Sequence, residues 1–248
     1  MFSRFQISHC PHNSKNNYGY FENFSAEFYR CLLQSFIIQM PTYKLTYFNA
    51  RGYAEPARLL FHLAGVPFED FRMTHGDGTW EKIKDSTPFG QVPVLSVDGT
   101  EIPQSMAIIR YLANQFGYAG KTPEEKAWVD AIVDQYKDFM SAFMQFVLAQ
   151  HNGKPTEEVE RLKTEVYAPA KETYIKILNG LLEKSKSGFL VGESLTFADL
   201  VVAENLFGLE KNEHFVAAEH PKLLALKENV YGIPAIKEYI KSRPDTQF

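Results

Sequence analysis

Residues 43–65 read YKLTYFNARGYAEPARLLFHLAG, and this stretch decides the fold of the domain that it begins. Its first six residues, 43–48, form a short β-prone run with alternating side chains, which predicts a half-buried strand. Residues 54–64 instead repeat apolar side chains at helical spacing, and Gly65 stands where a helix commonly ends. A strand followed directly by a helix predicts the start of an α/β domain.

The next fifty residues complete that domain. Residues 67–73, 92–97 and 100–102 predict three more strands, the last two joined by a hairpin turn at Asp98-Gly99. Residues 105–116 predict a second helix. The resulting order βαβ and then ββα is a parallel unit joined to a terminal hairpin, and helices that cover it make a compact domain. We therefore predict an α/β domain over residues 40–118.

A different pattern begins at Pro123, where proline near the first helical turn and two following glutamates favour a helix start. No strand pattern follows, and amphipathic stretches cover approximately residues 124–151, 156–182, 196–209 and 233–240. We therefore predict an all-helical domain over residues 119–248. Thr196 and Asp199 stand three apart before an apolar run, which is the spacing of a capping box, so we assign Asp199 a structural role.

Composition excludes several classes of protein. Hydrophobic residues make up 45% of the 248 residues and charged residues 23%, values typical of a globular chain. Lys and Arg number 26 against 30 Asp and Glu, a net charge of −4, which argues against a general nucleic-acid binder. No apolar stretch reaches the roughly 18 residues of a membrane-spanning helix. We therefore expect neither nucleic acid nor a membrane as partner.

The first 39 residues show no sustained period of 2 or 3.6, so we expect a disordered extension there and no domain. Glu22, Glu27 and the lack of an apolar core argue against a targeting peptide, and the alternative is that Met40 is the working start. The only cysteines, Cys10 and Cys31, lie in this segment, so residues 40–248 hold no disulfide and fit a reducing compartment. The crowded ligands in residues 9–12 do not fit a tetrahedral metal site, and we expect no metal.

Five stretches then occur in a characteristic order: PTYKLTYFNARGYAE at 41–55, DGTWEKIK at 77–84, PFGQVPVL at 88–95, PQSMAIIRYL at 103–112 and VDAIVDQYKDFM at 129–140. With these motifs, residues 40–248 resemble a cytosolic glutathione transferase. The match is best to the sigma class, which includes vertebrate haematopoietic prostaglandin D synthase and many nematode enzymes. The resemblance implies a thioredoxin-like domain followed by an all-helical domain, glutathione as co-substrate, and a cytoplasmic homodimer.

Tyr47 is the catalytic residue that the resemblance implies. A tyrosine hydroxyl at the carboxyl end of a strand faces the crevice where α/β sheets bind ligands, and it can donate a hydrogen bond to a sulfur anion. Lowering a thiol pKa by two units from about 8.5 requires about 2.7 kcal/mol of thiolate stabilisation, which a charge-assisted hydrogen bond can supply. Taken alone, Tyr47 fits better as an aromatic residue that fills a sheet surface, and the accompanying motifs favour the catalytic role.

The resemblance also implies how glutathione is held. Val92-Pro93 is expected to be a cis peptide whose Val92 main chain pairs with the cysteinyl backbone. Ser105, as N-cap of the following helix, and Gln104 would hold the γ-glutamyl carboxylate. Each position also has an ordinary structural explanation. Pro93 could simply begin a strand, Ser105 could only cap a helix, and Lys84 and Asp138 could be solvated surface charges. The full expected glutathione set is Tyr47, Trp80, Lys84, Gly90, Gln91, Val92, Pro93, Gln104 and Ser105, with Asp138 of the partner subunit reaching the γ-glutamyl amine.

The expected pocket for the second substrate comprises Phe48, Arg51, Tyr53 and Met140. The resulting function is conjugation of the glutathione thiolate to hydrophobic electrophiles such as aromatic halides and reactive aldehydes, with organic hydroperoxides and prostaglandin H as candidate side substrates. The alternative is a non-catalytic ligand carrier or crystallin-like structural protein.

Three positions depart from the family pattern. Tyr53 stands where many members have a second arginine, and Gln91 stands where related proteins have a lysine. Gln145 falls where the vertebrate prostaglandin synthase has a pocket tryptophan, which predicts slow isomerisation of prostaglandin H.

Overall fold

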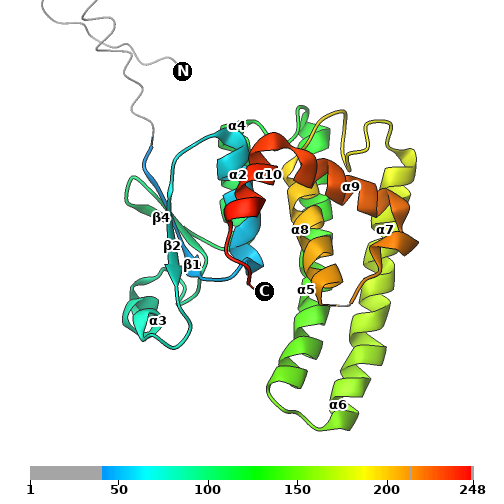
Figure 1. Ribbon diagram of the computed structural model, residues 1–248, viewed down its shortest axis with the longest axis horizontal. Helices are drawn as coiled ribbons and strands as arrows, with labels where there is room; N and C mark the ends of the chain where they lie inside the picture. The colour runs from blue at the N-terminus through cyan, green and yellow to red at the C-terminus, as the bar shows by residue number, and fades with distance from the viewer. Residues whose placement is uncertain (1–40, 213, 247–248) are drawn as a thin grey trace, which may run out of the picture. The chain divides into compact units, whose positions relative to one another are not determined.

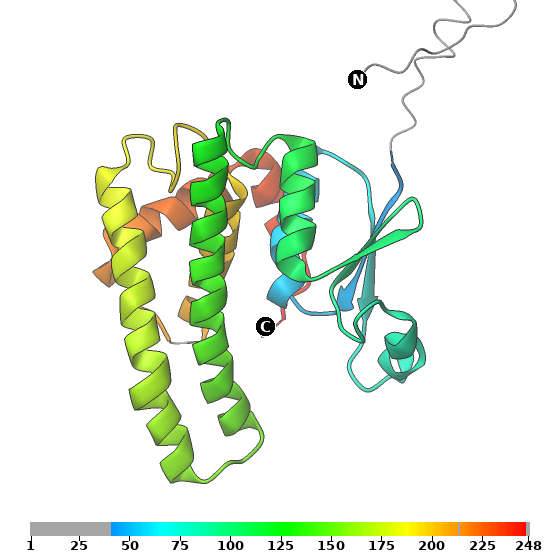
Figure 2. The same ribbon diagram turned by 180° about the vertical axis from the view of Figure 1, so that it is seen from behind.

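The computed structural model describes residues 41–212 and 214–246. The extension predicted at 1–39, with Cys10 and Cys31, lies outside these residues. From Pro41 onward the chain forms one compact unit, shown from two sides in Figures 1 and 2.

A four-stranded mixed sheet begins this unit, in the order β2-β1-β3-β4. β1 pairs in parallel with β2 and antiparallel with β3, which pairs antiparallel with β4. Asp98 and Gly99, with φ of 49° and 86°, make the turn between β3 and β4, and two positive φ values suit the twist of a hairpin. The predicted βαβ-ββα order is confirmed. The strands are β1 (Tyr43–Phe48), β2 (Glu69–Met73), β3 (Val94–Val97) and β4 (Thr100–Pro103).

Two helices, α2 (Glu55–Ala64) and α4 (Ser105–Phe116), cover one face of the sheet. Tyr43, Leu45 and Tyr47 are buried in alternation along β1, as the sequence pattern predicts. α2 and α4 pack against each other. Figure 1 shows them between the sheet and the long helices of the second part of the chain. A short helix, α3 (Thr79–Ile83), and two single-turn 3-10 helices (Gly52–Ala54 and Lys84–Ser86) lie in the connections.

Two predicted strands are longer than the observed ones. β2 begins at Glu69, two residues after Pro67, and β3 begins at Val94, directly after Pro93. Proline has no N–H to donate to a strand ladder, so each strand starts only after its proline. Residues 92 and 93 therefore lie in a turn and are free of the sheet.

The second part of the chain is entirely helical in the residues described, as predicted. The stretch expected as one helix over 156–182 is divided by a π-helical turn, Leu162–Tyr167. Pro169 follows this turn, and because it has no N–H it cannot continue the regular α-helical hydrogen bonding. The helix at 221–232 was not predicted. The elements are α5 (Pro123–His151), α6 (Thr156–Arg161), the π turn, α7 (Ala168–Lys184), α8 (Phe197–Lys211), a 3-10 turn (Ala217–Glu219), α9 (Pro221–Gly232) and α10 (Pro234–Ser242).

α8 is the central helix, because it packs against α5, α9, α2 and α4. Its first turn is fixed by Asp199, whose carboxylate accepts hydrogen bonds from Thr196 N (2.8 Å), Thr196 Oγ1 (3.0 Å) and Leu190 N (2.8 Å). The predicted capping role of Asp199 is therefore confirmed. Burial raises the pKa of this carboxyl to about 6, although the three hydrogen bonds oppose that rise.

Among the described residues, none of the helices combines the length and apolar character needed to cross a membrane. Nor do any three His, Cys, Asp or Glu side chains in residues 41–212 and 214–246 gather as a metal site would require.

Candidate active site

A cavity of about 830 Å³ lies between the α/β part of the chain and α5. One wall comes from the turns that follow β1, from α3, from the turn before β3 and from the start of α4. The other wall is one face of α5. Its lining residues are Phe48, Tyr53, Trp80, Gly90, Gln91, Val92, Pro93, Pro103, Gln104, Ser105, Met106, Ala107, Arg110, Asp134, Tyr136, Lys137, Met140 and Ser141.

The Tyr47 side chain is buried next to this cavity and contacts two lining residues, Phe48 and Tyr53. Its hydroxyl oxygen accepts a hydrogen bond from Tyr53 N at 3.3 Å, and the Arg58 guanidinium lies 6.0 Å from the centre of its ring. Burial raises the pKa of Tyr47, while the Tyr53 hydrogen bond and Arg58 act in the opposite direction. The phenol is therefore neutral near pH 7, with its oxygen already an acceptor and its proton available for donation.

Gly52 determines where the Tyr47 hydroxyl lies. Its φ is +41°, and a Cβ atom built on it would be 2.7 Å from Tyr47 Oη and 3.1 Å from Tyr47 Cε1. Only glycine combines this conformation with so close an approach. The turn after β1 therefore holds the phenol oxygen against the main chain of Gly52 and Tyr53. Tyr47 itself is not among the lining residues, but its neighbours Phe48 and Tyr53 are.

The start of α4 forms an anion-accepting corner of the cavity. Ser105 was predicted as the N-cap of this helix, and this was wrong: the N-cap is Gln104, with φ 74° and ψ 117°, and Ser105 is the first helical residue. The Ser105 hydroxyl has no hydrogen-bond partner within the described part of the chain, so a capping bond does not explain it. A non-glycine residue with positive φ beside a cavity is typical of a functional site. Free amides at the helix start also favour a negatively charged group.

The turn before β3 lines the same corner. The Val92-Pro93 peptide bond is cis, as the resemblance implied. Gln104 Nε2 donates to Gln91 Oε1 at 3.4 Å, which joins this turn to the start of α4. Residues 90–93 and 104–105 therefore make one continuous polar surface, with Gln91 at its exposed rim.

The two residues expected from the α3 region have different positions. Trp80 lines the cavity and contacts Phe48 edge to face, with ring centres 5.7 Å apart. Lys84 is exposed and is not among the lining residues, but a Cβ atom built on Gly90 would be 4.0 Å from Lys84 Cε. The Lys84 chain thus lies near the rim, within reach of a ligand that extends out of the cavity.

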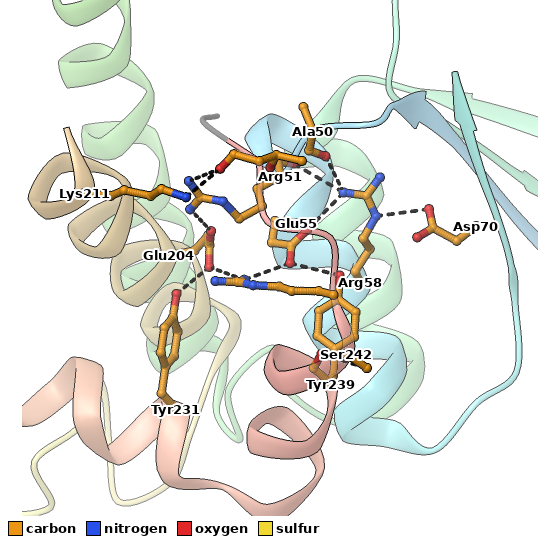
Figure 3. A network of polar contacts seen from close by, with 12 residues as sticks. Ala50, Arg51, Glu55, Arg58, Asp70, Glu204, Lys211, Tyr231, Tyr239 and Ser242 are labelled. Atoms are coloured by element: carbon orange, nitrogen blue, oxygen red, sulfur yellow. Dashed lines mark hydrogen bonds and ion pairs between the residues drawn. The ribbon is translucent and has the colours of Figure 1, made fainter. Parts of the chain in front are cut away.

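Arg51 is a correction to the predicted second-substrate pocket. Its side chain is buried away from the cavity, where Nη1 pairs with Glu204 Oε1 of α8 at 2.8 Å and the guanidinium lies 4.6 Å from the ring centre of Phe207. Glu204 also pairs with Arg243 at 3.1 Å. Figure 3 shows the surrounding contacts. We call Arg51, Glu55, Arg58, Glu204 and Arg243 the buried ion-pair network.

This network fixes the segment that follows β1. Arg58 Nη1 donates to the main-chain oxygen of Ala50 at 2.7 Å and pairs with Glu55 at 3.0 Å. Glu55 Oε1 accepts from Arg243 at 2.9 Å. Arg51 was expected in the second-substrate pocket, but buried carboxylates attract its charge more strongly than an apolar pocket does. Its role in this structure is to hold the turn that carries Gly52 and Tyr53.

The α5 wall was largely missed by sequence reasoning. Met140 lines the cavity as expected, and so do Tyr136, which was not predicted, and Lys137. Asp138 is exposed and is not among the lining residues, whereas Asp134 lines the cavity. The spacing of Asp134, Lys137 and Ser141 places them on one helix face, and that periodicity was the available signal.

Gln145 lies outside the cavity. It is exposed, and its Nε2 donates to Ser141 O at 3.3 Å. The position expected to replace a pocket tryptophan is therefore not among the residues that border this cavity.

The comparisons with known proteins cover both parts of the chain. The family profile for the N-terminal domain of glutathione S-transferase matches residues 43–114, and the profile for the C-terminal domain matches residues 120–243. Glutathione S-transferase 4 of Caenorhabditis elegans is 47% identical over 207 residues, which are 84% of this chain and 99% of the relative.

Solved structures agree with this match. A Nu-class glutathione S-transferase from Haemonchus contortus is 45% identical, with a TM-score of 0.73, and covers 84% of this chain and all of its own. Monomeric Na-GST-3 from Necator americanus is 45% identical, with a TM-score of 0.76 over the same shares. Prostaglandin synthase D of Nilaparvata lugens is 32% identical, with a TM-score of 0.74, over 83% of this chain and all of its own. From its fold, its two family matches and these relatives, the chain belongs to the glutathione S-transferase family and is an enzyme of that activity.

Proposed function

We propose that this enzyme joins the glutathione thiolate to hydrophobic electrophiles, with Tyr47 as the hydrogen-bond donor to sulfur. The observation that carries the proposal is the state of the Tyr47 hydroxyl. Burial keeps it protonated, the Tyr53 N–H donates to its oxygen, and the adjoining residues Phe48 and Tyr53 line the cavity. A neutral donor in a site of low polarity stabilises the thiolate relative to the thiol and so lowers the thiol pKa.

The polar corner of the cavity is the proposed site for the rest of glutathione. The unpaired Ser105 hydroxyl and the first amides of α4 suit the γ-glutamyl carboxylate, with Gln104 beside them. The Val92 main chain, ahead of cis Pro93, suits the cysteinyl backbone. Trp80, Gly90, Gln91 and the nearby Lys84 ammonium suit the glycyl end.

The apolar part of the cavity is the proposed site for the electrophile. Phe48, Tyr53 and Met140 line it, and apolar walls with few directional contacts admit a range of small hydrophobic compounds. Aromatic halides and reactive aldehydes are the proposed main substrates, which would make the enzyme one of detoxification. Reduction of organic hydroperoxides and isomerisation of prostaglandin H are proposed as minor activities, the second through the sigma-class resemblance.

We also propose a homodimer of the sigma class that acts in the cytosolic glutathione pool. Asp138, exposed on α5 near the cavity, would then serve the neighbouring subunit's glutathione. If this is correct, the protein sediments as a dimer, and Asp138→Asn weakens glutathione binding without changing the Tyr47-dependent thiol pKa.

The test of the proposed chemistry compares Tyr47→Phe with Tyr43→Phe. Both tyrosines are buried on the same face of β1, but only Tyr47 is next to the cavity. Returning the bound thiol pKa from about 6.5 to about 8.5 lowers the thiolate fraction at pH 6.5 about 50-fold. Conjugation of 1-chloro-2,4-dinitrobenzene should fall by a similar factor in Tyr47→Phe and stay near wild type in Tyr43→Phe. Equal activity of the two variants, with glutathione still bound, would remove Tyr47 from the mechanism.

A further inference from the structure

Tyr136 projects from α5 into the wall of the cavity that faces the turn after β1. Only 7% of the residue is exposed, and yet it is a lining residue. Burial raises the pKa of its phenol well above the usual value, and Tyr53 and Tyr47 add to this rise. The three tyrosines therefore form one neighbourhood, in which the Tyr136 hydroxyl is a neutral hydrogen-bond donor near pH 7.

The hydroxyl of Tyr136 has no hydrogen-bond partner in residues 41–212 and 214–246. It differs from the hydroxyls of Tyr167 and Tyr174, which are also unpartnered there but are fully sealed from the surface. The Tyr136 hydroxyl is not one of these sealed groups, and Tyr136 lines the cavity. A ring that only filled this wall would be better served by phenylalanine, because an unpaired hydroxyl at an apolar surface costs free energy.

Several other polar side chains in or beside the cavity already have hydrogen-bond or ion-pair partners within the protein. Gln104 donates to Gln91, Arg110 pairs with Asp130 at 2.6 Å, and the Tyr47 oxygen accepts from Tyr53 N. The helix start at Ser105 suits a carboxylate of glutathione. Tyr136 is thus a donor on the α5 wall, near Tyr47 and Tyr53 and one helical turn from the apolar residue Met140.

We propose that the Tyr136 hydroxyl binds an oxygen atom of the electrophile and thereby selects compounds whose reacting carbon is conjugated to a carbonyl group. This assignment rests on the proposed function, since it presumes a thiolate beside Tyr47. It makes Tyr136 a specificity-determining residue. The favoured class is that of α,β-unsaturated aldehydes and ketones.

The chemistry of this class explains what a donor at Tyr136 does. The thiolate lone pair forms a C–S bond to the β-carbon, and the C=C π pair shifts so that negative charge develops on the carbonyl oxygen. A hydrogen bond from the phenol strengthens as this charge develops, which lowers the barrier. The enolate then takes a proton at the α-carbon from water, which balances the proton lost earlier by the thiol. No oxidant or reductant is needed.

Two substrates with the same nucleophile test this assignment. The first is trans-2-nonenal, whose oxygen gains charge during addition, and the second is methyl iodide, whose leaving iodide is a weak hydrogen-bond acceptor. In Tyr136→Phe, kcat/KM for nonenal should fall about 10- to 100-fold, because one charge-assisted hydrogen bond is lost. The value for methyl iodide should stay within about twofold by the same argument. Tyr174→Phe, which removes an equally unpartnered hydroxyl that does not line the cavity, should leave both values unchanged.

Each other outcome overturns the assignment. Unchanged nonenal turnover in Tyr136→Phe means that the hydroxyl does not contact the carbonyl. Equal losses for both substrates, with unaltered thermal unfolding, mean that Tyr136 acts on the thiolate and not on the electrophile. If the wild-type enzyme conjugates methyl iodide but not nonenal, the conjugation activity stands and the selection by Tyr136 fails. Absence of both reactions in the wild type would refute the proposed function itself.

Discussion

Replacing Arg243 by methionine should destabilise the protein more than any surface charge removal. Arg243 Nη1 lies 2.9 Å from Glu55 Oε1 and 3.1 Å from Glu204 Oε2, and the three side chains are 6%, 0% and 7% exposed. Removing one member of a buried pair costs about 3–5 kcal/mol, because the remaining charge stays buried without compensation. For a chain of this size, each kcal/mol lowers Tm by roughly 2–4 °C, so the shift should be about 6–20 °C.

The pH dependence of this loss provides a sharper check. Burial raises the pKa of Glu204, and Arg243 is the largest influence that opposes this rise. Without Arg243 the folded-state pKa of Glu204 rises further above its unfolded value, so the folded state binds the extra proton. Stability of the variant must therefore increase as pH falls from 8 through that pKa, and the deficit relative to wild type should shrink toward pH 5.

Urea unfolding at pH 8, 6.5 and 5 measures both effects. Lys241→Met is the matched control, because Lys241 pairs with Glu238 at 3.2 Å on the same helix, with side chains 63% and 79% exposed. It should cost less than about 1 kcal/mol at every pH. If Arg243→Met costs no more than this control, or if its deficit is the same at pH 5 and pH 8, the reasoning about uncompensated burial is refuted.

Two further predictions concern the site. Gly52→Ala places a Cβ atom 2.7 Å from Tyr47 Oη at φ +41°, so conjugation should fall at least about 10-fold and its pH profile should move to higher pH; an unmoved profile would show that the turn does not position the phenol. Gln91→Lys adds a charge at the rim where Gln91 is exposed, so calorimetry should show glutathione Kd lowered about threefold to tenfold at low salt and less at high salt; a Kd that does not change with salt would contradict a carboxylate contact there.

Local sequence patterns were sufficient to predict most of the secondary structure. Alternation in residues 43–48, the Asp98-Gly99 turn and the Thr196/Asp199 pair each act within a few residues, so each could be predicted from the sequence. The division at 162–167 could not be predicted as readily, because the amphipathic period continues across it while Pro169 changes the hydrogen bonding. Helix α9 was missed although its apolar residues Leu223, Leu226 and Val230 are buried.

The site was less predictable, because its contacts join distant residues. Arg51 pairs with Glu204, 153 positions away, and nothing near Arg51 in the sequence indicates that partner. Tyr136 lies inside the 129–140 motif, in which only Asp138 and Met140 were expected to serve the site, and helical period alone did not reveal which residues meet the cavity. Ser105 was one position from the true N-cap, because the positive φ of Gln104 is not encoded by any local turn preference for glutamine.

The two walls of the cavity differ in how they are built, and this has an evolutionary consequence. The wall that we assign to glutathione depends on main-chain geometry at Val92, Pro93 and Gln104, which few substitutions preserve. The α5 wall is a regular helix face, on which Tyr136, Lys137 and Met140 can be exchanged without altering the backbone. A duplicated gene could therefore acquire a new electrophile through changes on one helix while it inherits thiol activation intact. The architecture separates the part that must be kept from the part that is open to selection.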